Sequence, residues 1–432
     1  MSATLRTVTL GCKVNQYETE FVREGLVGIG YRNVADDEQA DLCVVNTCTV
    51  TNEGDAKSRR AIRRLARENP QSRIVVMGCY ATRAPDEVAS LPQVVEVVTD
   101  KRELPDLLGR FGVVDIPTGI SGFGNRHRAY VKVQDGCLLR CSYCIIPKVR
   151  PQMYSRPMQP ILDEVRRLQD NGYREIVLTG VHLGHYGVDW NRNKPKSQWM
   201  RLADLVEQLA KLEADFRIRL SSIEATEVTR ELLRVMREYE NKVCPHLHVC
   251  LQSGSDRILR RMKRRWGAKM FVDRCGMAAD ALDKPAFSTD VIVGFPGETD
   301  ADFEESCRVV GEVGFSKVHV FPFSPRRDTP AADMPEQLPK PIKSQRSRQM
   351  SKLEAELRKQ YFERLNGTPL RVLVEGMDPE SPGKLVGTSC RYAPVEFSGG
   401  AELCGSLVDV TAGAVVGDRI HGCTPTAPLE AV

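Results

Sequence analysis

The sequence lacks the features that would place the chain in a membrane or mark it for export. None of its apolar runs approaches the roughly 20 residues that a membrane-spanning helix needs. The N-terminus, Met1 to Arg6, has no basic start, apolar core or cleavage site of a signal peptide, and it leads directly into a strand-like segment. We therefore expect a cytoplasmic protein that has no membrane partner.

The chain also has little excess charge. It has 61 Lys and Arg residues against 57 Asp and Glu residues, so the net charge of +4 neither favours nor excludes a nucleic-acid partner. A length of 432 residues is enough for several domains and for cores that fold without disulfides. Local groups of residues must therefore indicate the function.

Cysteine, in contrast, is abundant, because the chain has 14. In a reducing cytosol, cysteines are more often metal ligands, catalytic groups or buried side chains than disulfide partners. Cys137, Cys141 and Cys144 lie close together, and three thiolates at such spacings can hold three irons of a cubane iron–sulfur cluster. The fourth iron would then be open to a substrate. The alternatives are a chance cluster and a zinc site completed by a distant histidine, since three cysteines are one ligand short of a closed site.

Strands alternate with helices in the first third of the chain. This pattern indicates a doubly wound parallel sheet. Its strand candidates are Thr7–Leu10, Leu42–Val45 and Ile74–Met77. Cys12, Cys48 and Cys79 each follow one of these strands, and the carboxyl ends of parallel strands form the ligand-binding edge of such a sheet. We expect the three cysteines to converge there, although an isolated cysteine is often only a buried side chain.

The alternation resumes after a Gly-, Ser- and Arg-rich linker at Gly119–Arg128. Six strand candidates separated by helices suggest a partial (βα)6 barrel, which periodicity alone does not distinguish from a flat sheet. These candidates are Tyr130–Val133, Glu175–Thr179, Phe216–Leu220, His246–Val249, Ser288–Val293 and Lys317–Phe321. A charged helix at Ile342–Arg364 then leads to short β runs that predict a small five-stranded barrel. We expect an α/β chain of three domains, at residues 1–120, 121–365 and 366–432.

The cysteine triplet resembles that of the radical S-adenosylmethionine superfamily. Its spacing, its position after the first barrel strand and Tyr143 before the last cysteine all match. The resemblance implies that Cys137, Cys141 and Cys144 hold a 4Fe–4S cluster whose open iron binds the amino and carboxylate groups of S-adenosylmethionine. In that superfamily, the reduced cluster cleaves S-adenosylmethionine into methionine and a 5′-deoxyadenosyl radical, which abstracts hydrogen from an unactivated C–H bond. It implies no catalytic residues beyond the cluster ligands.

A second resemblance narrows the family to the methylthiotransferases. Three runs are similar to the N-terminal domain of that family: Leu10–Gln16, Val45–Val50 and Met77–Ala81. In the family, these runs supply the cysteines of a second 4Fe–4S cluster, which carries the transferred sulfur. The resemblance therefore implies that Cys12, Cys48 and Cys79 are cluster ligands. It covers nearly the whole chain, and the C-terminal barrel resembles the RNA-binding TRAM module of these enzymes.

Residues at the ends of the barrel strands are candidates to bind S-adenosylmethionine. Gly180 and Gly294 lack a Cβ atom, so a cofactor can approach their backbone closely. Gln252 and Ser222 are placed to hydrogen-bond the methionine moiety or the ribose, and Tyr143 lies beside the cluster ligands. The alternative for each glycine or polar residue is an ordinary turn or strand end.

Three further features are less informative. His182 and His185 are spaced like a metal-binding pair, but we expect no metal there because the sequence shows no third ligand nearby. Cys250 stands where the family has proline, and Arg150-Pro151 replaces the usual Arg-Gly. The eight cysteines outside the two triplets have no paired spacing and are expected to fill space.

Basic residues that follow Cys48 at helical spacing are candidates to bind RNA phosphates. The helix carries Arg60, Arg63 and Arg64 on one side, although such a run is more often a solvated face. The segment from Gly367 onward has only four basic residues against eight acidic ones, which is unfavourable for non-specific phosphate binding.

The resemblance implies a tRNA methylthiotransferase that acts at C2 of a modified adenosine beside the anticodon. The run from Gly11 to Gln16 most resembles the branch that acts on N6-threonylcarbamoyladenosine. Lys13, Asn15, Gln16 and Arg156 are candidates to bind its carboxylate and hydroxyl groups, because a buried unpaired charge is costly. The alternatives are N6-isopentenyladenosine, an aspartate of a ribosomal protein, or a non-catalytic iron–sulfur protein that binds RNA or senses redox state. The expected partners are tRNA and an electron donor such as flavodoxin or ferredoxin, and the protein is expected to be a monomer.

Overall fold

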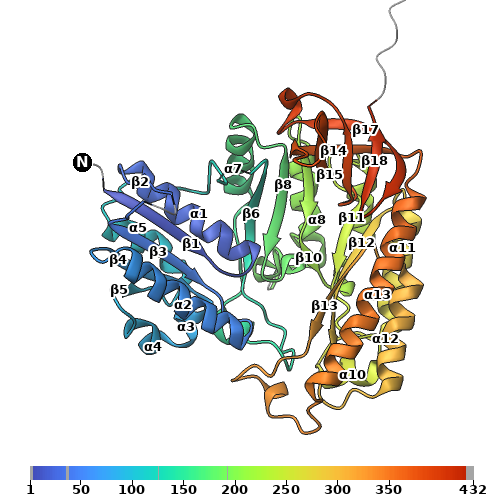
Figure 1. Cartoon of the computed structure of the whole chain (residues 1–432), viewed down its shortest axis with the longest axis horizontal. Coiled ribbons are helices and arrows are strands. Elements are labelled where there is room, and N and C mark those ends of the chain that lie inside the picture. The colour runs from blue at the N-terminus through green and yellow to red at the C-terminus, as the bar shows by residue number, and fades with distance from the viewer. Residues whose placement is uncertain (1–2, 36–37, 125, 192, 425–432) are drawn as a thin grey trace, which may run out of the picture.

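The N-terminal part of the chain is a parallel five-stranded sheet covered by helices (Figure 1). The computed structural model describes residues 3–35, 38–124, 126–191 and 193–424. The strand order is β2-β1-β3-β4-β5, and every pair is parallel. The strands are β1 (Thr4–Thr9), β2 (Arg32–Asn33), β3 (Leu42–Thr47), β4 (Arg73–Gly78) and β5 (Val94–Val97). All of β3 and nearly all of β4 are buried, as in sheets that are covered on both faces. The predicted doubly wound sheet is confirmed.

Capping residues mark the start of the long helix α2 (Asn52–Glu68) in this part. The Thr51 side chain accepts the N–H of Gly54, and Glu53 and Asp55 lie in the first turn, near the positive end of the helix dipole. Its buried face carries Ile62 and Leu65. The other helices are α1 (Lys13–Gly28), α3 (Cys79–Arg83), α4 (Pro85–Ala89) and α5 (Leu104–Arg110).

The central part is a partial barrel of six main parallel strands, as predicted. Two four-stranded sheets, β7-β6-β8-β9 and β10-β11-β12-β13, are linked by a parallel bridge between Ile218 and Val243. The main strands are β6 (Arg128–Asp135), β8 (Glu175–Gly180), β9 (Arg217–Leu220), β11 (His246–Val249), β12 (Ala286–Val293) and β13 (Lys317–Pro322). The two-residue strands β7 (Tyr154–Ser155) and β10 (Ser222–Ile223), like β2 and β5, were not predicted. Three of these four are too short to carry a periodic pattern.

Helices cover the outer face of these strands. They are α7 (Met158–Asp170), α8 (Leu202–Ala210), α9 (Arg230–Glu238), α11 (Ala268–Ala281) and α12 (Asp300–Val313). The short helix α6 (Ile146–Val149) packs against Cys79 instead, and α10 (Asp256–Arg261) packs on Phe295 and Phe323 beyond the strand ends. Alternate strand residues such as Val131, Leu247 and Val291 enter the apolar core beneath the helices. The intervening residues, among them Tyr130 and Asp290, therefore lie on the opposite side, which we call the inner face.

The C-terminal part is a small closed barrel reached through the long helix α13 (Lys340–Arg364). Its strands occur in the order β14-β15-β16-β18-β17. Their bounds are β14 (Pro369–Met377), β15 (Lys384–Ser389), β16 (Pro394–Ser398), β17 (Leu407–Val416) and β18 (Arg419–Cys423). The predicted five-stranded barrel is confirmed, although β16 was not among the predicted strands.

The small barrel packs directly against the central one (Figure 1). The Tyr392 ring lies 4.6 Å from the Arg219 guanidinium on the inner face of β9. Arg217 donates a hydrogen bond to the carbonyl of Thr388 at 2.8 Å. Within the described residues, no helix is both long and apolar enough to cross a membrane.

Candidate functional site: two cysteine triads

Cys12, Cys48 and Cys79, which we call the strand-end triad, gather at one edge of the N-terminal sheet. Strands β1, β3 and β4 are neighbours, so the residues that follow them lie side by side. A Cβ atom on Gly11 would lie 3.0 Å from the Cys48 sulfur. Cys12 is exposed at this edge, Cys48 is half-buried and Cys79 is buried. The structure thus brings these three predicted residues together.

Two glycines shape the turns that present this triad. Gly11 and Gly78 have φ values of +101° and +98°, which other residues rarely adopt. A Cβ atom on Gly78 would also approach the Asn46 side chain to 2.4 Å. Each glycine directly precedes a cysteine at a helix start: Cys12 is the N-cap of α1, and Cys79 is the first residue of α3. Helix N-termini favour thiolates because their free N–H groups carry partial positive charge.

Cys137, Cys141 and Cys144, which we call the loop triad, lie between β6 and α6. The Cys144 N–H donates to the Cys141 carbonyl at 3.1 Å. Burial raises the pKa of the Cys144 thiol to about 12, and Cys141 and Cys137 contribute to the rise. Such a thiol stays protonated at neutral pH unless a metal ion displaces the proton. The donor set therefore suits a metal cluster.

One arginine donates to a sulfur of each triad. Arg150 Nε lies 3.4 Å from Cys79 Sγ, and Arg264 Nη1 lies 3.5 Å from Cys141 Sγ. A cluster held by thiolates needs hydrogen bonds and compensating charge when it is buried. Both triads fit a 4Fe–4S cluster in this respect.

Arg150 also links the two triads through a buried ionic network. Its guanidinium contacts Glu18 at 2.8 Å and Asp135 at 2.7 Å, and Lys132 lies 2.7 Å from Glu18. Burial alone would raise the pKa values of Glu18 and Asp135, but the charges of Arg150 and Lys132 outweigh it and lower both. Asp135 lies two residues before Cys137, so the network joins the N-terminal sheet domain to the loop triad.

The loop triad has a second neighbour that sequence reasoning missed. The ligand atoms of His182, His185 and Glu227 lie within 4.8 Å of one another, so the expectation that no third ligand lies nearby is wrong. His182 Nδ1 lies 3.6 Å from Cys137 Sγ. Burial lowers the pKa of His182, but hydrogen bonds with Cys137 and Glu227 raise it to about 10. Glu227 was missed because it is distant in sequence and only the barrel closes the gap.

Four of the proposed cofactor residues lie at the ends of barrel strands. The Gln252 backbone has φ +70° and bonds β12 through Asp290 and Ile292. Ser222 is exposed on β10. The Cβ positions of Gly180 and Gly294 face Gln134 and Lys343 respectively, so neighbouring side chains alone account for both glycines.

Tyr143 packs within the loop triad region. It contacts the apolar cluster that contains Ile258 and Phe295. Burial raises the pKa of its hydroxyl well above the ordinary value, so the group is neutral at physiological pH. Its contact with a cofactor stays a prediction.

The structure separates the four residues predicted to bind the substrate. Asn15 donates to the carbonyls of Leu10 and Thr47 and thereby shapes the strand-end triad. Gln16 accepts a hydrogen bond from Arg126, and Arg156 pairs with the buried Glu164 at 2.7 Å. Lys13 extends over the inner face of β6, with its ammonium 6.0 Å from the centre of the Tyr130 ring.

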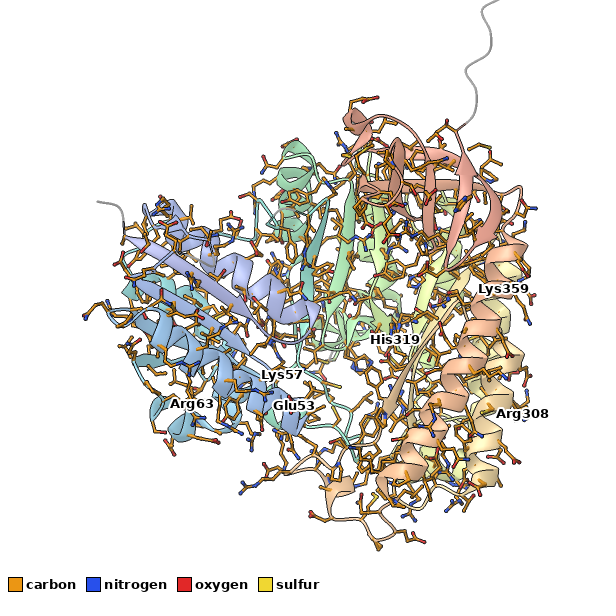
Figure 2. The ribbon with its side chains drawn as sticks, viewed as in Figure 1. Glu53, Lys57, Arg63, Arg308, His319 and Lys359 are labelled. Carbon is orange, nitrogen blue, oxygen red and sulfur yellow. The ribbon has the colours of Figure 1, made fainter. Side chains whose placement is uncertain are left out.

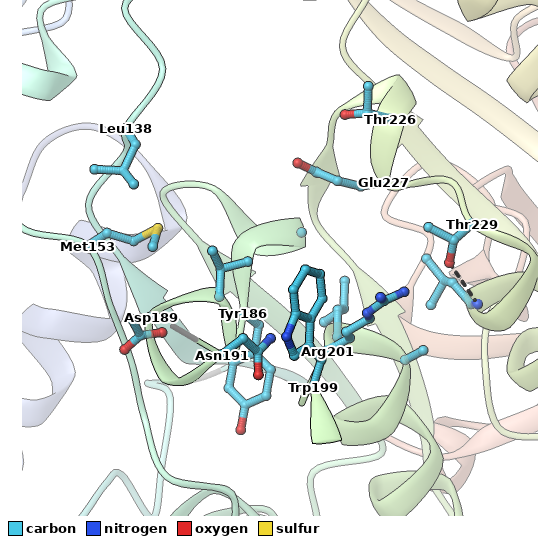
Figure 3. Close-up of a pocket in the computed structure, with 15 residues that line it drawn as sticks. Leu138, Met153, Tyr186, Asp189, Asn191, Trp199, Arg201, Thr226, Glu227 and Thr229 are labelled. Carbon is cyan, nitrogen blue, oxygen red and sulfur yellow. Dashed lines mark hydrogen bonds between the residues drawn. The ribbon is translucent and has the colours of Figure 1, made fainter. Parts of the chain in front are cut away.

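A cavity of about 790 Å³ opens beside the loop triad (Figure 3). Leu138 of the cysteine loop and Glu227 line it from opposite sides of the view. Trp199 and Arg201 also line it, with the guanidinium 5.3 Å from the Trp199 ring.

The predicted RNA-binding arginines lie on α2, away from the barrel. Arg63 is exposed and projects outward in Figure 2. Arg60 pairs with Glu53 at 2.5 Å, and Arg64 lies 3.8 Å from Glu68. Their placement is compatible with either a solvated face or a phosphate contact.

Comparison with known proteins identifies both halves of the site. Residues 4–100 match the profile of Uncharacterized protein family UPF0004, and residues 131–310 match the Radical SAM superfamily. The chain is 38% identical to the threonylcarbamoyladenosine tRNA methylthiotransferase MtaB of Bacillus subtilis, over 94% of this chain and 93% of that protein. It is 40% identical to MtaB of Chlamydia pneumoniae, over 87% of each chain. It is 32% identical to the tRNA-2-methylthio-N(6)-dimethylallyladenosine synthase of Aquifex aeolicus, over 93% and 94%.

Solved structures show the same fold at low sequence identity. The radical S-adenosylmethionine methyltransferase TsrM of Kitasatospora setae superposes with a TM-score of 0.55 at 12% identity, over 77% of this chain and 75% of that one. Sequence and fold therefore agree. The chain belongs to the radical S-adenosylmethionine methylthiotransferase family, whose cofactors are S-adenosylmethionine and two 4Fe–4S clusters.

Proposed function

We propose that this enzyme methylthiolates C2 of N6-threonylcarbamoyladenosine beside the anticodon of tRNA. The observation that carries the proposal is the pairing of two cysteine triads joined by Arg150. The names of the relatives that are 38–40% identical support this modified adenosine as the substrate. The dimethylallyladenosine synthases, at 31–32% identity, support the isopentenyl alternative less.

The two triads would divide the work. Cys137, Cys141 and Cys144 would hold the cluster that binds S-adenosylmethionine, and Cys12, Cys48 and Cys79 the cluster that carries sulfur. When bound, these groups supply one-electron cleavage of S-adenosylmethionine and the transferred sulfur.

The surrounding residues orient the ligands of the triads and the cofactor. Arg150, Arg264 and His182 hold individual cysteine sulfurs in place. The residues proposed to bind S-adenosylmethionine are Tyr143, Gly180, Ser222, Gln252 and Gly294.

The proposed RNA contacts favour the helices over the C-terminal barrel. Three of the four cations of that barrel are already paired: Arg371 with Asp215, Arg391 with Asp283 and Arg419 with Asp378. We therefore assign phosphate binding first to Arg60, Arg63 and Arg64.

Several wider assignments accompany this proposal. Residues 1–120, 121–365 and 366–432 would form the sulfur-carrying domain, the radical-generating core with its long helix, and the TRAM-like barrel. The enzyme would work as a cytoplasmic monomer that receives electrons from a flavodoxin or a ferredoxin.

The test is to offer the reduced, reconstituted enzyme tRNA that carries either modified adenosine and to identify the methylthio product by mass. We expect conversion of the threonylcarbamoyl form. Nucleoside mass spectrometry of tRNA from cells that lack the protein should show the corresponding loss. A preference for the isopentenyl form would overturn the substrate assignment and leave the family assignment intact.

A further inference from the structure

The inner face of β11, β12 and β13 carries ionisable side chains that the cysteine triads do not use. Ligand atoms of His248, Asp290 and His319 lie within 4.8 Å of one another. The strand register places Asp290 opposite His319, and His248 opposite Ser288. His248 Nε2 lies 3.5 Å from Asp290 Oδ1, and its Nδ1 lies 3.1 Å from Ser288 Oγ. His248 therefore lies between Ser288 and Asp290, with its Nδ1 hydrogen-bonded to Ser288 and its buried Nε2 facing Asp290 without a hydrogen bond.

Lys13 extends from the N-terminal sheet domain toward the same inner face of the barrel. The side chain is half-buried and extends over Tyr130 on the inner face of β6. The surrounding side chains partly desolvate His319 and lower its pKa most, and nearby positive charges that include Lys13 lower it further, whereas Asp290 raises it. Burial and nearby cations, Lys13 among them, also lower the pKa of His246. Lys13 thus shares one electrostatic environment with the histidines of β11 and β13.

The inner face carries further positive charge at its end nearest the C-terminal barrel. Arg128, Arg217 and Arg219 lie 3.6, 2.5 and 3.0 Å from the buried Glu175. Arg128 also pairs with Glu375 of the C-terminal barrel at 2.5 Å. Arg217 and Arg219 also donate to the carbonyls of Thr388 and Ser389, so the C-terminal barrel closes this end of the inner face.

Two side chains on β13 remain open to solvent within this charged region. His319 is exposed and lies near the centre of the molecule in Figure 2, whereas Arg308 and Lys359 project from its surface. Phe321, two residues further on the same face of β13, is 50% exposed. An exposed aromatic ring offers a stacking surface for a base, and the adjacent cations offer partners for an anion.

We propose that Lys13 and His319 bind the carboxylate of the substituent on the substrate adenosine, and that Asp290, which lies between His248 and His319, accepts a hydrogen bond from its hydroxyl group. This proposal rests on the proposed function, because only a threonylcarbamoyl substituent offers both groups. An isopentenyl substituent would leave Lys13, Asp290 and His319 without partners. A site built to hydrogen-bond a ligand strongly rejects an analogue that lacks the matching groups.

The test compares three anticodon stem-loop RNAs that differ only at the substrate adenosine. One carries N6-threonylcarbamoyladenosine, one carries its neutral methyl ester, and one carries unmodified adenosine. We expect the wild-type holoenzyme to bind the first RNA about 10- to 100-fold more tightly than the ester. Lys13→Met and His319→Phe should abolish that preference without weakening binding of the ester. His319→Gln, which keeps a hydrogen-bond donor, should restore part of it.

Controls separate recognition from loss of the clusters. Iron content and RNA-independent formation of 5′-deoxyadenosine, measured in every variant, identify any variant that has lost a cluster. Lys269→Met, at an 86% exposed lysine on α11, should leave all binding constants unchanged.

Three results would overturn the proposal. The wild type could bind the acid and the ester equally while still converting the acid. The Lys13→Met and His319→Phe variants could keep the wild-type preference. Stoichiometric zinc, retained by the wild type and lost in His319→Phe, would instead assign the group to a metal. Conversion of isopentenyladenosine RNA alone is a separate outcome, because it would defeat the proposed function itself.

Discussion

The two triads reach the same chemistry by different routes. The loop triad occupies one short segment, so its spacing is visible in the sequence and its geometry depends on local turns. The strand-end triad draws on residues from Cys12 to Cys79 and exists only once three strands pair in register. Each triad receives one arginine N–H, but Arg150 belongs to a network of buried charges whereas Arg264 pairs with Glu224. The comparison teaches that the geometry of the loop triad depends mainly on one short segment. The geometry of the strand-end triad depends on the pairing of three strands.

Removal of the loop triad is expected to have the largest effect. Replacing Cys137, Cys141 and Cys144 with alanine should abolish cleavage of S-adenosylmethionine, because no ligands remain for its cluster. Iron should fall from about eight to about four atoms per chain. Iron analysis and chromatography of 5′-deoxyadenosine measure both effects. One bound zinc and little iron in the wild type would contradict the assignment.

Removal of the strand-end triad should separate the two activities. With Cys12, Cys48 and Cys79 replaced by alanine, the enzyme should still form 5′-deoxyadenosine but should yield no methylthio product. Mass spectrometry of the RNA and the cofactor products distinguishes the two. Simultaneous loss of both activities in a folded variant would show that the triads do not work independently.

Replacement of Arg150 or Arg264 compares how much the charged groups beside each triad contribute to stability. Arg150→Met leaves Glu18 and Asp135 buried with only Lys132 as a partner, and we expect it to lower the free energy of unfolding by about 3–5 kcal/mol. Arg264→Met should cost less, because it leaves one carboxylate, Glu224, that is partly exposed. Arg308→Met, at a 64% exposed arginine, should change stability by less than about 0.5 kcal/mol. Urea unfolding of the three variants tests this order.

The same network predicts a dependence on pH. The pKa values of Glu18 and Asp135 are lowered in the folded protein, against the effect of burial, by Arg150 and Lys132. Their contribution is therefore fully present above the ordinary carboxyl pKa of about 4 and is lost as the pH falls through the lowered values. The stability difference between wild type and Arg150→Met should be constant from about pH 7 to about pH 4 and should shrink as the pH falls below about 4. A difference that stays constant over the whole range would show that the network does not govern acid stability.

Charge removal on α2 should have the smallest effect. Replacing Arg60, Arg63 and Arg64 with glutamine should weaken tRNA binding and reduce its log–log salt slope by about 1 for each lost phosphate contact. The paired states of Arg60 and Arg64 predict a total below about 3. A matched variant at Lys211, Lys269 and Arg308 removes three surface charges elsewhere. Equal salt slopes of tRNA binding for the two variants would show that these arginines form a solvated face and do not contact phosphates.

The sequence predicted the architecture well because periodicity and local spacing are short-range signals. The six barrel strands, the parallel N-terminal sheet and the C-terminal barrel all follow from apolar runs and turn residues. The convergence of Cys12, Cys48 and Cys79 could be inferred because strand ends share an edge in parallel sheets.

The substrate-facing residues could not be assigned in the same way. Asn15, Gln16 and Arg156 were predicted from their positions in the family motifs. In the structure, each of them instead bonds to other protein groups, namely Thr47, Arg126 and Glu164. Glu227 and the His248–Asp290–His319 group depend on pairing between strands, which one sequence does not reveal. The alternation of polar residues along β11 and β12 was the available signal.

Tyr392 gives the C-terminal barrel a fixed attachment rather than a flexible tether. Its ring rests on Arg219, and Arg217 binds the carbonyl of Thr388, so separation of the two barrels would expose buried guanidinium groups. An RNA that contacts the C-terminal barrel is therefore held at a constant distance from the loop triad. The distance between the C-terminal barrel and the loop triad would then determine which adenosine of one RNA loop reaches the cluster.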